Sequence, residues 1–443
     1  MAQYQNDAER RRKARLAKKA REARKRRQFR SRLLLAAAII VLAAFLLFFT
    51  GQGGEDPTEP VQTDPPVQTT PPETRPQVTE PQQTDAPRPQ TGSTVIHVSV
   101  AGDLNVTDYM LENAAHANGY DFSQAFLDVA PLLSGADLTL LNFEGNLSGG
   151  TYGYETGAAP LELPKALKAI GVDVVQTANS AAIRQGVSGL VTTLDAFEHV
   201  GLTTLGTYAD SADFRKSGGY EIVEVSGIRI ALIAFTKGMD NLGLPAGSED
   251  CVNLLYEDYS SDYKKVDTER IAKVLRNVSE EQPDITIAML HWGSEYNDEI
   301  SDSQKKILKQ LQEGGVDIIV GSHPHLVQRI DYDPIAGTLV AYSLGDFFGD
   351  AVMAGTNYSI ILDLEITKDN ATGEVRVSGY DYTPIFTLKP EQSASGGHRV
   401  VRIREAMERY ESDFVGRVTD EAYGDMEYAL KRIEKRVHPD EEE

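Results

Sequence analysis

Three of the eight histidines of this chain lie close together, each shortly after an apolar run. His291 follows Ile285–Leu290 directly, and His323 and His325 follow Val316–Val320 with one proline between them. Both apolar runs have the length and composition of buried β-strands. Imidazole is the commonest protein ligand for transition metals, and a strand end holds a side chain on a rigid support. The pattern predicts a metal site at the edge of a sheet; the alternative is three histidines hydrogen-bonded in ordinary loops.

Two carboxylates follow apolar runs in the same manner. Asp103 comes shortly after the expected strand Val95–Val100, and Glu144 comes shortly after Leu138–Leu141. Asp103 taken alone is more typical of a turn or a helix cap, whereas glutamate is a poor turn former. Carboxylates combined with imidazoles suit one or two borderline divalent ions such as Mn, Fe or Zn, and not an all-oxygen Ca or Mg site. We therefore expect both carboxylates and the three histidines to be metal ligands.

The N-terminal part of the chain differs sharply in composition from the rest. Residues 1–32 hold 14 Lys/Arg against 3 Asp/Glu, and Leu33–Phe49 is a run of 17 residues without a polar side chain. Such a run is near the lower limit for a transmembrane helix, and basic residues before it predict a cytoplasmic N-terminus that contacts anionic lipid. Because no small-residue cleavage pattern follows, we expect an uncleaved signal anchor over 33–50, with a cleaved signal peptide as the alternative.

A linker is expected after the anchor. Residues 51–93 are rich in Pro, Thr, Gln and acidic residues and contain 10 of the 20 prolines, a composition that cannot bury a core and predicts an extended spacer. The expected protein is a single-pass protein of the cell membrane with a basic cytoplasmic tail and an extracellular globular region from residue 94. Its single cysteine, Cys251, excludes internal disulfides.

The charge of the remaining chain excludes one class of partner. Outside the basic arm there are 30 Lys/Arg and 63 Asp/Glu, a net charge of −33. A surface this acidic argues against nucleic acid and against attracting a polyanion by general electrostatics. An anionic ligand would need a local positive site, which a bound metal supplies.

Strand-like runs alternate with helical patterns up to residue 320, and strands alone are expected from Leu326–Ile330 onward. The helical patterns include one over Phe122–Leu133. This order predicts an α/β layered sandwich with a mixed sheet over residues 94–390, rather than a purely doubly wound fold. Two amphipathic helices are expected in a C-terminal extension over 391–443.

Five motifs occur in a fixed order along the globular region. They are Gly102-Asp103, Asn142-Phe143-Glu144, His291-Trp292-Gly293-Ser294-Glu295-Tyr296, Gly321-Ser322-His323-Pro324-His325-Leu326-Val327-Gln328 and Tyr342-Ser343-Leu344-Gly345-Asp346-Phe347. Their order and spacing resemble the bacterial CapA family of poly-γ-glutamate capsule-biosynthesis proteins. The resemblance covers about Val95 to Phe348. It implies the four-layer α-β-β-α sandwich of the calcineurin-like metallophosphoesterases and a role in assembling or exporting an anionic polymer.

The chain departs from that family where the family reads roughly A-N-N-H-A-x-D-Y-G. In the matching segment, Ser180 and Ala181 occupy the Asn and His positions, and Arg184 replaces an acidic residue. In metallophosphoesterases that Asn is a metal ligand and that His assists proton transfer, which is typically worth about 10²–10⁴-fold. Alanine supplies no such help, so the catalytic residue stays unassigned. Asn179 is one residue out of step, and its side chain is expected to point the other way.

Further motif residues are expected to contact the substrate or the metal ligands. They are Asn142, Asn179, Arg184, Trp292, Glu295, Tyr296 and Asp346. Trp292 is expected mainly to pack beside His291, whereas Glu295 and Tyr296 either line the cleft or lie in a solvated loop. Asp346, which replaces an Asn of the family motif, is expected to be a ligand or a hydrogen-bond partner of a site histidine.

Two functions follow from the resemblance and its departures. The first is a metal-dependent surface hydrolase or transferase that uses a metal-bound hydroxide on a phosphoester or a γ-glutamyl polymer. The second is a membrane-tethered accessory protein that binds the polymer or the synthase and export subunits. We favour the second because the acid–base residue is missing, while the retained ligands keep the first open.

Overall fold

The computed structural model describes residues 92–147, 150–394, 396–410 and 417–439. The expected basic tail, the signal anchor over 33–50 and the linker up to residue 91 lie outside the described residues. Within the described part, no helix is both long enough and apolar enough to cross a membrane.

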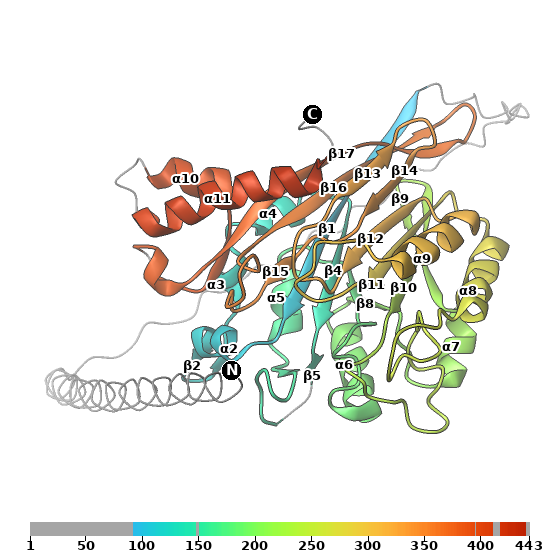
Figure 1. Ribbon diagram of the computed structural model, residues 1–443, viewed down its shortest axis with the longest axis horizontal. Helices are drawn as coiled ribbons and strands as arrows, with labels where there is room; N and C mark the ends of the chain where they lie inside the picture. The colour runs from blue at the N-terminus through green and yellow to red at the C-terminus, as the bar shows by residue number, and fades with distance from the viewer. Residues whose placement is uncertain (1–91, 148–149, 395, 411–416, 440–443) are drawn as a thin grey trace, which may run out of the picture. The chain divides into compact units, whose positions relative to one another are not determined.

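The first sheet has eight strands and is mixed (Figure 1). Its parallel half contains β1 (Ser93–Asn105), β4 (Leu138–Glu144), β7 (Val174–Gln176), β8 (Thr203–Leu205) and β15 (Asp346–Phe348). Its antiparallel half contains β16 (Tyr358–Asp369), β17 (Val375–Leu388) and β18 (Arg399–Arg402). Strand β1 joins the halves, because it pairs with β4 and β15 in parallel and with β16 in antiparallel.

The second sheet has six strands. Its parallel core contains β10 (Ile228–Thr236), β11 (Ile285–His291), β12 (Ile318–Ser322) and β14 (Thr338–Ala341), with β9 (Tyr220–Val225) and β13 (Ile330–Asp333) as antiparallel edges. Two short pairs lie outside both sheets: β2 (Ala115–His116) with β3 (Gly119–Tyr120), and β5 (Asn146–Leu147) with β6 (Ala158–Ala159).

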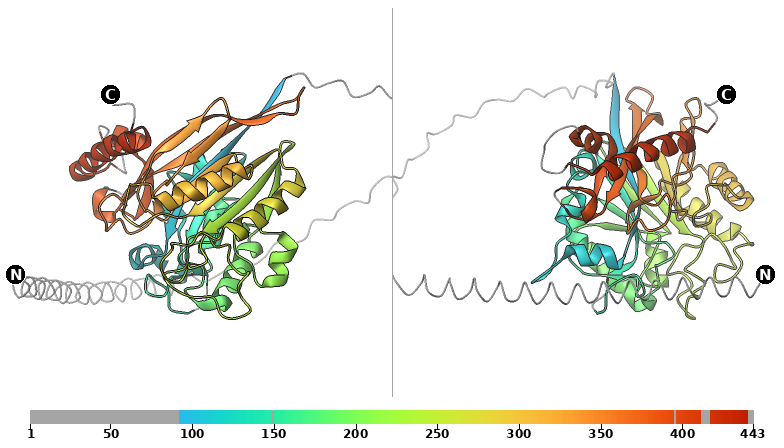
Figure 2. Two further views of the ribbon diagram at one scale, coloured as in Figure 1. Left: turned by 45° about the vertical axis from the view of Figure 1, so that its right-hand side comes forward. Right: turned by 60° about the vertical axis from the view of Figure 1, so that its left-hand side comes forward.

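The two sheets pack face to face through apolar side chains at every second position of their strands. Val98 and Leu140 of the first sheet belong to the same buried cluster as Ile287 and Val320 of the second. On each strand, the residues that alternate with these core positions point to the outer face of the sheet, where helices cover them. Figures 1 and 2 show the resulting layers.

Helices cover both outer faces. The first sheet is covered by α2 (Asp108–Ala114), α3 (Ser123–Phe126), α4 (Ala130–Leu133), α5 (Leu163–Ala169) and part of α6 (Gly186–His199). The second is covered by α8 (Thr268–Glu281) and α9 (Asp302–Glu313), with α7 (Ser211–Ser217) beside α8. The described residues therefore form the predicted α-β-β-α sandwich.

The C-terminal helices occupy the inner layer beside the second sheet. A short 3₁₀ helix, Pro390–Gln392, precedes β18, and then come α10 (Ile403–Tyr410) and α11 (Asp420–Val437). Met426 and Ile433 of α11 share a buried cluster with Leu362 and Phe386, which face the same side of the first sheet as the sheet–sheet core. The two helices lie at the opposite end of the sandwich from α7 and α8 (Figure 2).

Two local predictions are wrong. The expected helix Phe122–Leu133 is two short helices, and Pro131 lies in the first turn of the second, where a residue without an N–H is tolerated. The expected strand Leu326–Ile330 is not formed: Val327 makes a single bridge to Leu344, and β13 begins only at Ile330.

His398 generates a prediction about stability. It is 4% exposed between Tyr109 and Phe348, and among the described residues neither ring nitrogen has a hydrogen-bond partner. Burial lowers the pKa of His398 to about 4. The unfolded state therefore binds a proton below its ordinary pKa of about 6.5 while the folded state does not, so stability falls as the pH drops from 7.5 to 4.5.

We expect His398→Phe to remove about 2–3 kcal/mol of that pH dependence. Urea unfolding of both proteins at the two pH values measures it. An identical pH dependence in parent and variant contradicts the assignment.

Candidate metal centre

The chemistry-bearing residues lie where the parallel strands of both sheets end. In the first sheet, Asp103 of β1 pairs in register with Asn142 of β4, and Glu144 is the last residue of β4. In the second sheet, His291 at the end of β11 pairs with Ser322 at the end of β12. Asp103 and Glu144 are thus part of their strands rather than beyond them, which fixes both carboxylates firmly.

The structure brings all five residues predicted as ligands together. Three overlapping groups have ligand atoms within 4.8 Å of one another: Glu144, His291 and His323; Asp103, Glu144 and His325; and Glu295, His323 and His325. Because the groups share members, they form one continuous centre, in which more than one set of three ligands could hold an ion. Glu295, expected either to line the cleft or to lie in a solvated loop, joins this centre from an exposed position.

Unpartnered buried atoms show that the residues fit a metal. Glu144 Oε2, His291 Nε2 and His323 Nδ1 are buried without a hydrogen-bond partner among the described residues. His291 Nε2 lies 3.3 Å from Glu144 Oε1, within ion-pair distance. Each such atom costs about 1–3 kcal/mol when left unsatisfied. All three belong to one ligand group, and a divalent ion would satisfy them together.

Asp103 is held from both sheets. Its Oδ1 accepts a hydrogen bond of 2.5 Å from Asn142 Nδ2, and its Oδ2 accepts one of 3.0 Å from the backbone N–H of His323. Gly102 makes this possible, because a Cβ at that position would lie 1.9 Å from the carbonyl oxygen of Gly345. The glycine of the first motif is therefore required by close backbone packing.

The two histidines around Pro324 have left-handed backbones. The φ angles are +91° for His323 and +57° for His325, a conformation that costs a non-glycine residue about 1–3 kcal/mol. The contact from His323 N–H to Asp103 and a 2.7 Å contact between His325 Nδ1 and Asp346 Oδ1 hold this turn. Asp346 thereby orients the His325 ring beside Asp103, whose Oδ2 lies 3.9 Å from His325 Nδ1.

Charge sets opposite proton affinities in the centre. Burial, followed by the neighbouring Glu144, raises the pKa of Asp103. Burial acts to lower the pKa of His325, but Asp346 and the other carboxylates outweigh it and raise that pKa to about 11. Burial and the adjacent His291 hold the pKa of His323 well below its usual range. His323 is thus neutral, as a ligand must be, and His325 is the cation that balances the carboxylates when no metal does so.

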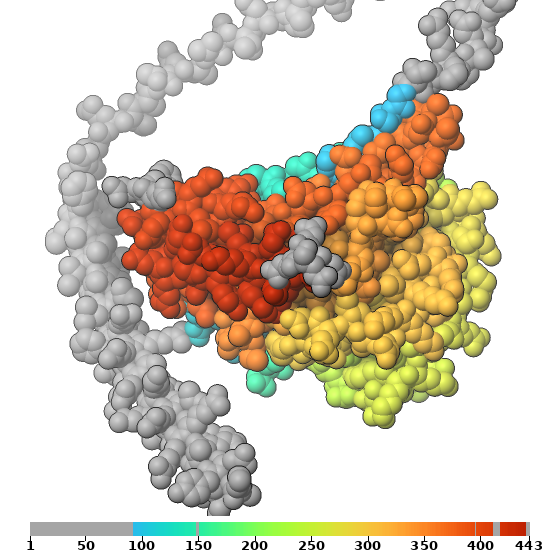
Figure 3. Space-filling model, turned by 45° about the horizontal axis from the view of Figure 1, so that its top comes forward, coloured from blue at the N-terminus to red at the C-terminus, as the bar shows by residue number. Residues whose placement is uncertain are grey.

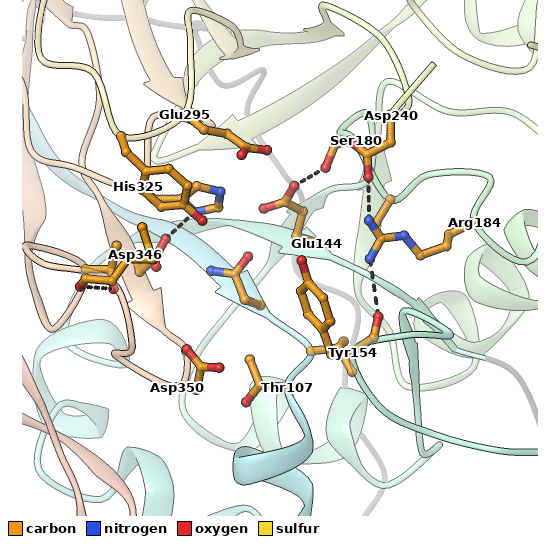
Figure 4. A pocket seen from close by; sticks show the side chains of 17 residues that line it. Thr107, Glu144, Tyr154, Ser180, Arg184, Asp240, Glu295, His325, Asp346 and Asp350 are labelled. Atoms are coloured by element: carbon orange, nitrogen blue, oxygen red, sulfur yellow. Dashed lines mark hydrogen bonds and ion pairs between the residues drawn. The ribbon is translucent and has the colours of Figure 1, made fainter. Parts of the chain in front are cut away.

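The altered motif reaches the centre through Ser180. The Ser180 hydroxyl donates a hydrogen bond to Glu144 Oε1 (Figure 4). Ser180 therefore supports a candidate ligand, whereas the family has a metal-binding Asn at this position. Asn179 does not take over the ligand role: its Nδ2 donates to Asn142 Oδ1 at 3.0 Å and to the carbonyl of Phe143 at 2.6 Å. Ala181 lines the pocket beside Glu144 and offers no proton.

An open pocket lies over the centre. Tyr296 stacks on His325 with 5.5 Å between ring centroids and forms one wall. Arg184 lines the other side, where its guanidinium pairs with Asp240 and donates to the carbonyl of Tyr154 (Figure 4). The expected cation near the site is therefore present, but it is already neutralised by an aspartate.

Sequence reasoning missed several lining residues. Asp240, Tyr154 and Asp350 line the main pocket, and Lys237 lines an adjoining one with His323. Lys237 follows β10 directly, so its position after a buried strand was a usable signal.

Trp292 belongs to the core rather than to the site. It is fully buried, its Nε1 donates to the carbonyl of Tyr342 at 2.9 Å, and its ring stacks on Tyr342. Alternation along the chain explains this, because His291 points toward the centre and the next side chain points into the layer under α9. A contact between Trp292 and substrate is therefore not supported.

Residues 97–351 match the sequence profile of the bacterial capsule synthesis protein family PGA_cap. The chain belongs to this family. The matched range contains Asp103, Glu144 and the three histidines, whereas α10 and α11 lie outside it. The PGA_cap match thus covers the candidate metal centre, and β16, β17 and β18 of the first sheet lie beyond it together with the C-terminal helices.

Two curated relatives have similar sequences over about two thirds of this PGA_cap protein. The PGA biosynthesis protein CapA of Bacillus subtilis (strain 168) is 28% identical over 315 residues, which is 67% of this chain and 74% of that protein. The capsule biosynthesis protein CapA of Bacillus anthracis is 27% identical over 316 residues, 69% of this chain and 72% of that protein. Among solved structures, the calcineurin-like phosphoesterase YfkN from Bacillus subtilis aligns at 14% identity with a TM-score of 0.41, over 66% of this chain and 91% of that one.

The metal centre of this PGA_cap protein is tested by its metal content. We expect the purified full-length protein to carry close to one or more Mn, Fe or Zn ions, and the variant His323→Ala/His325→Ala to carry none. Elemental analysis measures this, and chelation should lower the unfolding temperature of the parent but not that of the double variant. Lys264→Ala, at an exposed lysine outside the centre, is the control. A parent without metal, folded like the variant, would falsify the assignment.

Proposed function

We propose that this protein takes part in the synthesis or export of a poly-γ-glutamate-type capsule polymer, as an accessory protein that binds the polymer at its metal centre. The observation that carries the proposal is a convergent set of metal-binding side chains beside Ala181, a residue that cannot transfer a proton. Membership of the PGA_cap family and the names of both relatives support the capsule role.

The chemistry of such a polymer suits the centre. A poly-γ-glutamate chain carries one free carboxylate per residue, and an open divalent site binds carboxylates. Glu144, His291 and His323 would hold the ion, with Asp103, Glu295 and His325 beside them. The bound ion would supply the local positive charge that an otherwise acidic cleft needs. Tyr296 and the paired Arg184 then limit how a chain can lie across the opening.

One observation favours a second candidate, a metal-dependent hydrolase of phosphoesters or γ-glutamyl linkages. His325 lines the pocket, and its Nδ1 is hydrogen-bonded to Asp346. Burial raises the pKa of Asp346 to about 6, although the neighbouring His325 acts to lower it. A carboxyl–imidazole pair of this kind can store a proton near neutral pH. It is the only buried pair of that type that lines the main pocket within the described residues.

Location and partners complete the proposal. A single-pass anchor over 33–50 would place the domain outside the cell, where a surface polymer emerges, and the linker would give it reach. The partners proposed are the polymer itself and the membrane subunits that make or export it. Nucleic acid is not among them, since the chain outside the basic arm is strongly acidic.

Turnover separates the two candidates. We expect the parent protein to show only background phosphodiesterase activity, and Ser180→Asn/Ala181→His to raise it about 10²-fold or more, because the variant restores a ligand and a proton donor. A generic chromogenic phosphodiester assayed with added Mn measures this, with Ser188→Asn, at an exposed position of α6, as the control. Comparable turnover by the parent means that the accessory role is wrong.

The capsule role is tested in the cell that makes this protein. We expect deletion of its gene to reduce cell-associated polyglutamate strongly, and the His323→Ala/His325→Ala variant to fail to restore it. The parent and Lys264→Ala should both restore it. Normal polymer levels in the deletion strain would rule out the capsule role.

A further inference from the structure

A second pocket, outside the metal centre, lies between α11 and the segments that lead away from the centre. We call it the α11 pocket. Its lining contains five basic residues against two acidic ones: Lys305, Arg329, Arg432, Lys435 and Arg436, with Asp298 and Glu299. Figure 3 shows the face on which the C-terminal helices (red) meet the orange segments. A basic lining stands out on a domain where acidic residues outnumber basic ones about two to one.

Helix stability accounts for only part of this charge. Arg432, Lys435 and Arg436 lie in the last turns of α11, where cations interact favourably with the helix dipole. Arg329 precedes β13 and pairs with Asp331 at 2.6 Å, and Lys305 pairs with Asp302 at 3.3 Å in the first turn of α9. The dipole of α11 explains neither of them. Four separate segments thus contribute to one lining.

Two arginines of this pocket share one resident carboxylate. Asp298 Oδ2 lies 3.4 Å from Arg436 Nη2 and 4.0 Å from Arg432 Nη2. The Nε atoms of both arginines are without a hydrogen-bond partner among the described residues. The half-exposed Asp298 therefore shows which chemical group this pair accepts. Arg436 Nη1 also donates to the Tyr358 hydroxyl at 3.4 Å, so the more exposed Arg432 is the arginine that would contact a second carboxylate.

A buried amide adds an acceptor to the pocket. Gln328, the last residue of the fourth motif, is 2% exposed, and its Nε2 donates to the carbonyl of Asn297 at 2.9 Å. Its Oε1 has no partner among the described residues, although Gln328 lines the pocket. An unsatisfied buried acceptor beside paired cations suits a ligand that has an amide N–H next to a carboxylate.

The pocket and the metal centre are built on the same two segments. Glu295 and Tyr296 line the cleft over the centre, and Asp298 and Glu299 of the same loop line the α11 pocket. In the other segment, His325 faces the centre while Gln328 and Arg329 line the pocket. A chain that occupies the pocket therefore lies beside the cleft.

We propose that the α11 pocket binds a γ-linked glutamate chain through its free carboxylates and amide N–H groups and holds it next to the metal centre. The identity of the polymer rests on the proposed function; the preference for carboxylates rests on the arginine pair and Asp298. A phosphate polymer is the competing ligand, to be distinguished by experiment.

Binding of a fluorescent γ-linked glutamate oligomer of about ten residues to the full-length protein tests this. Anisotropy is measured at about 0.15 M salt, where distant exposed charges are screened, and with a chelator present, so that the metal centre does not contribute. We expect Arg432→Gln/Arg436→Gln to raise the Kd about tenfold or more. Asp298→Asn should lower the Kd about threefold or more, because it removes the competing carboxylate.

The control is Lys264→Gln/Lys265→Gln, which makes the same charge change at two exposed lysines outside the pocket. We expect it to change the Kd less than about twofold, since exposed charges act weakly at a distance. Equal loss of binding in the control and in the arginine variant would overturn the proposal. The opposite direction expected for Asp298→Asn guards against a variant that weakens binding by unfolding.

Competing ligands settle the chemistry. An α-linked glutamate oligomer and polyphosphate of similar charge should each bind more weakly than the γ-linked chain. Equal binding of either one overturns the assignment to a γ-linked chain. If the gene deletion leaves the capsule intact while the arginine-dependent binding persists, the proposed function fails and the polycarboxylate site stands.

Discussion

Asp103 is the constraint on which the rest of the centre depends. It is a fully buried carboxylate on the central strand of the first sheet, yet it accepts the backbone N–H of His323 from the second. One short side chain therefore fixes how the two sheets are aligned at their carboxyl ends. Burial penalises its charge, so the site must supply positive charge nearby, and either His325 or a metal can do so. The acidic centre, the left-handed turn and the buried imidazoles follow from this requirement.

Much of the centre could be predicted from the sequence, because its main residues lie on or next to buried strands. Asp103, Glu144 and His291 follow apolar runs that are easy to recognise, and strand ends converge in a layered fold. Glu295 was harder to place, since it lies on a loop whose path depends on a contact between Tyr296 N–H and the carbonyl of Pro324. Asp240 reaches the pocket only through a loop without periodic pattern, so its position depends on tertiary structure.

The layered fold was predictable from the alternation of helices and strands, but the packing of the C-terminal helices α10 and α11 was not. Amphipathic patterns indicated two C-terminal helices, yet no local signal says which surface they cover. Met426 and Ile433 of α11 continue the inner face beside the second sheet, because β16 and β17 are longer than the strands opposite them. Their packing places three basic residues of the last turns of α11, Arg432, Lys435 and Arg436, near the loop that carries Glu295.

The pairing of β1 has a consequence for how this domain is made. β1 is the first strand of the described domain, and its antiparallel partner β16 begins more than 250 residues later in the chain. Local contacts cannot complete the centre of the first sheet, so β1 keeps one edge unpaired until β16 has been synthesised. Long-range pairing of this kind slows folding and exposes strand edges to other chains. The apolar strand β1 is therefore open to pairing with other chains during most of the translation of this domain.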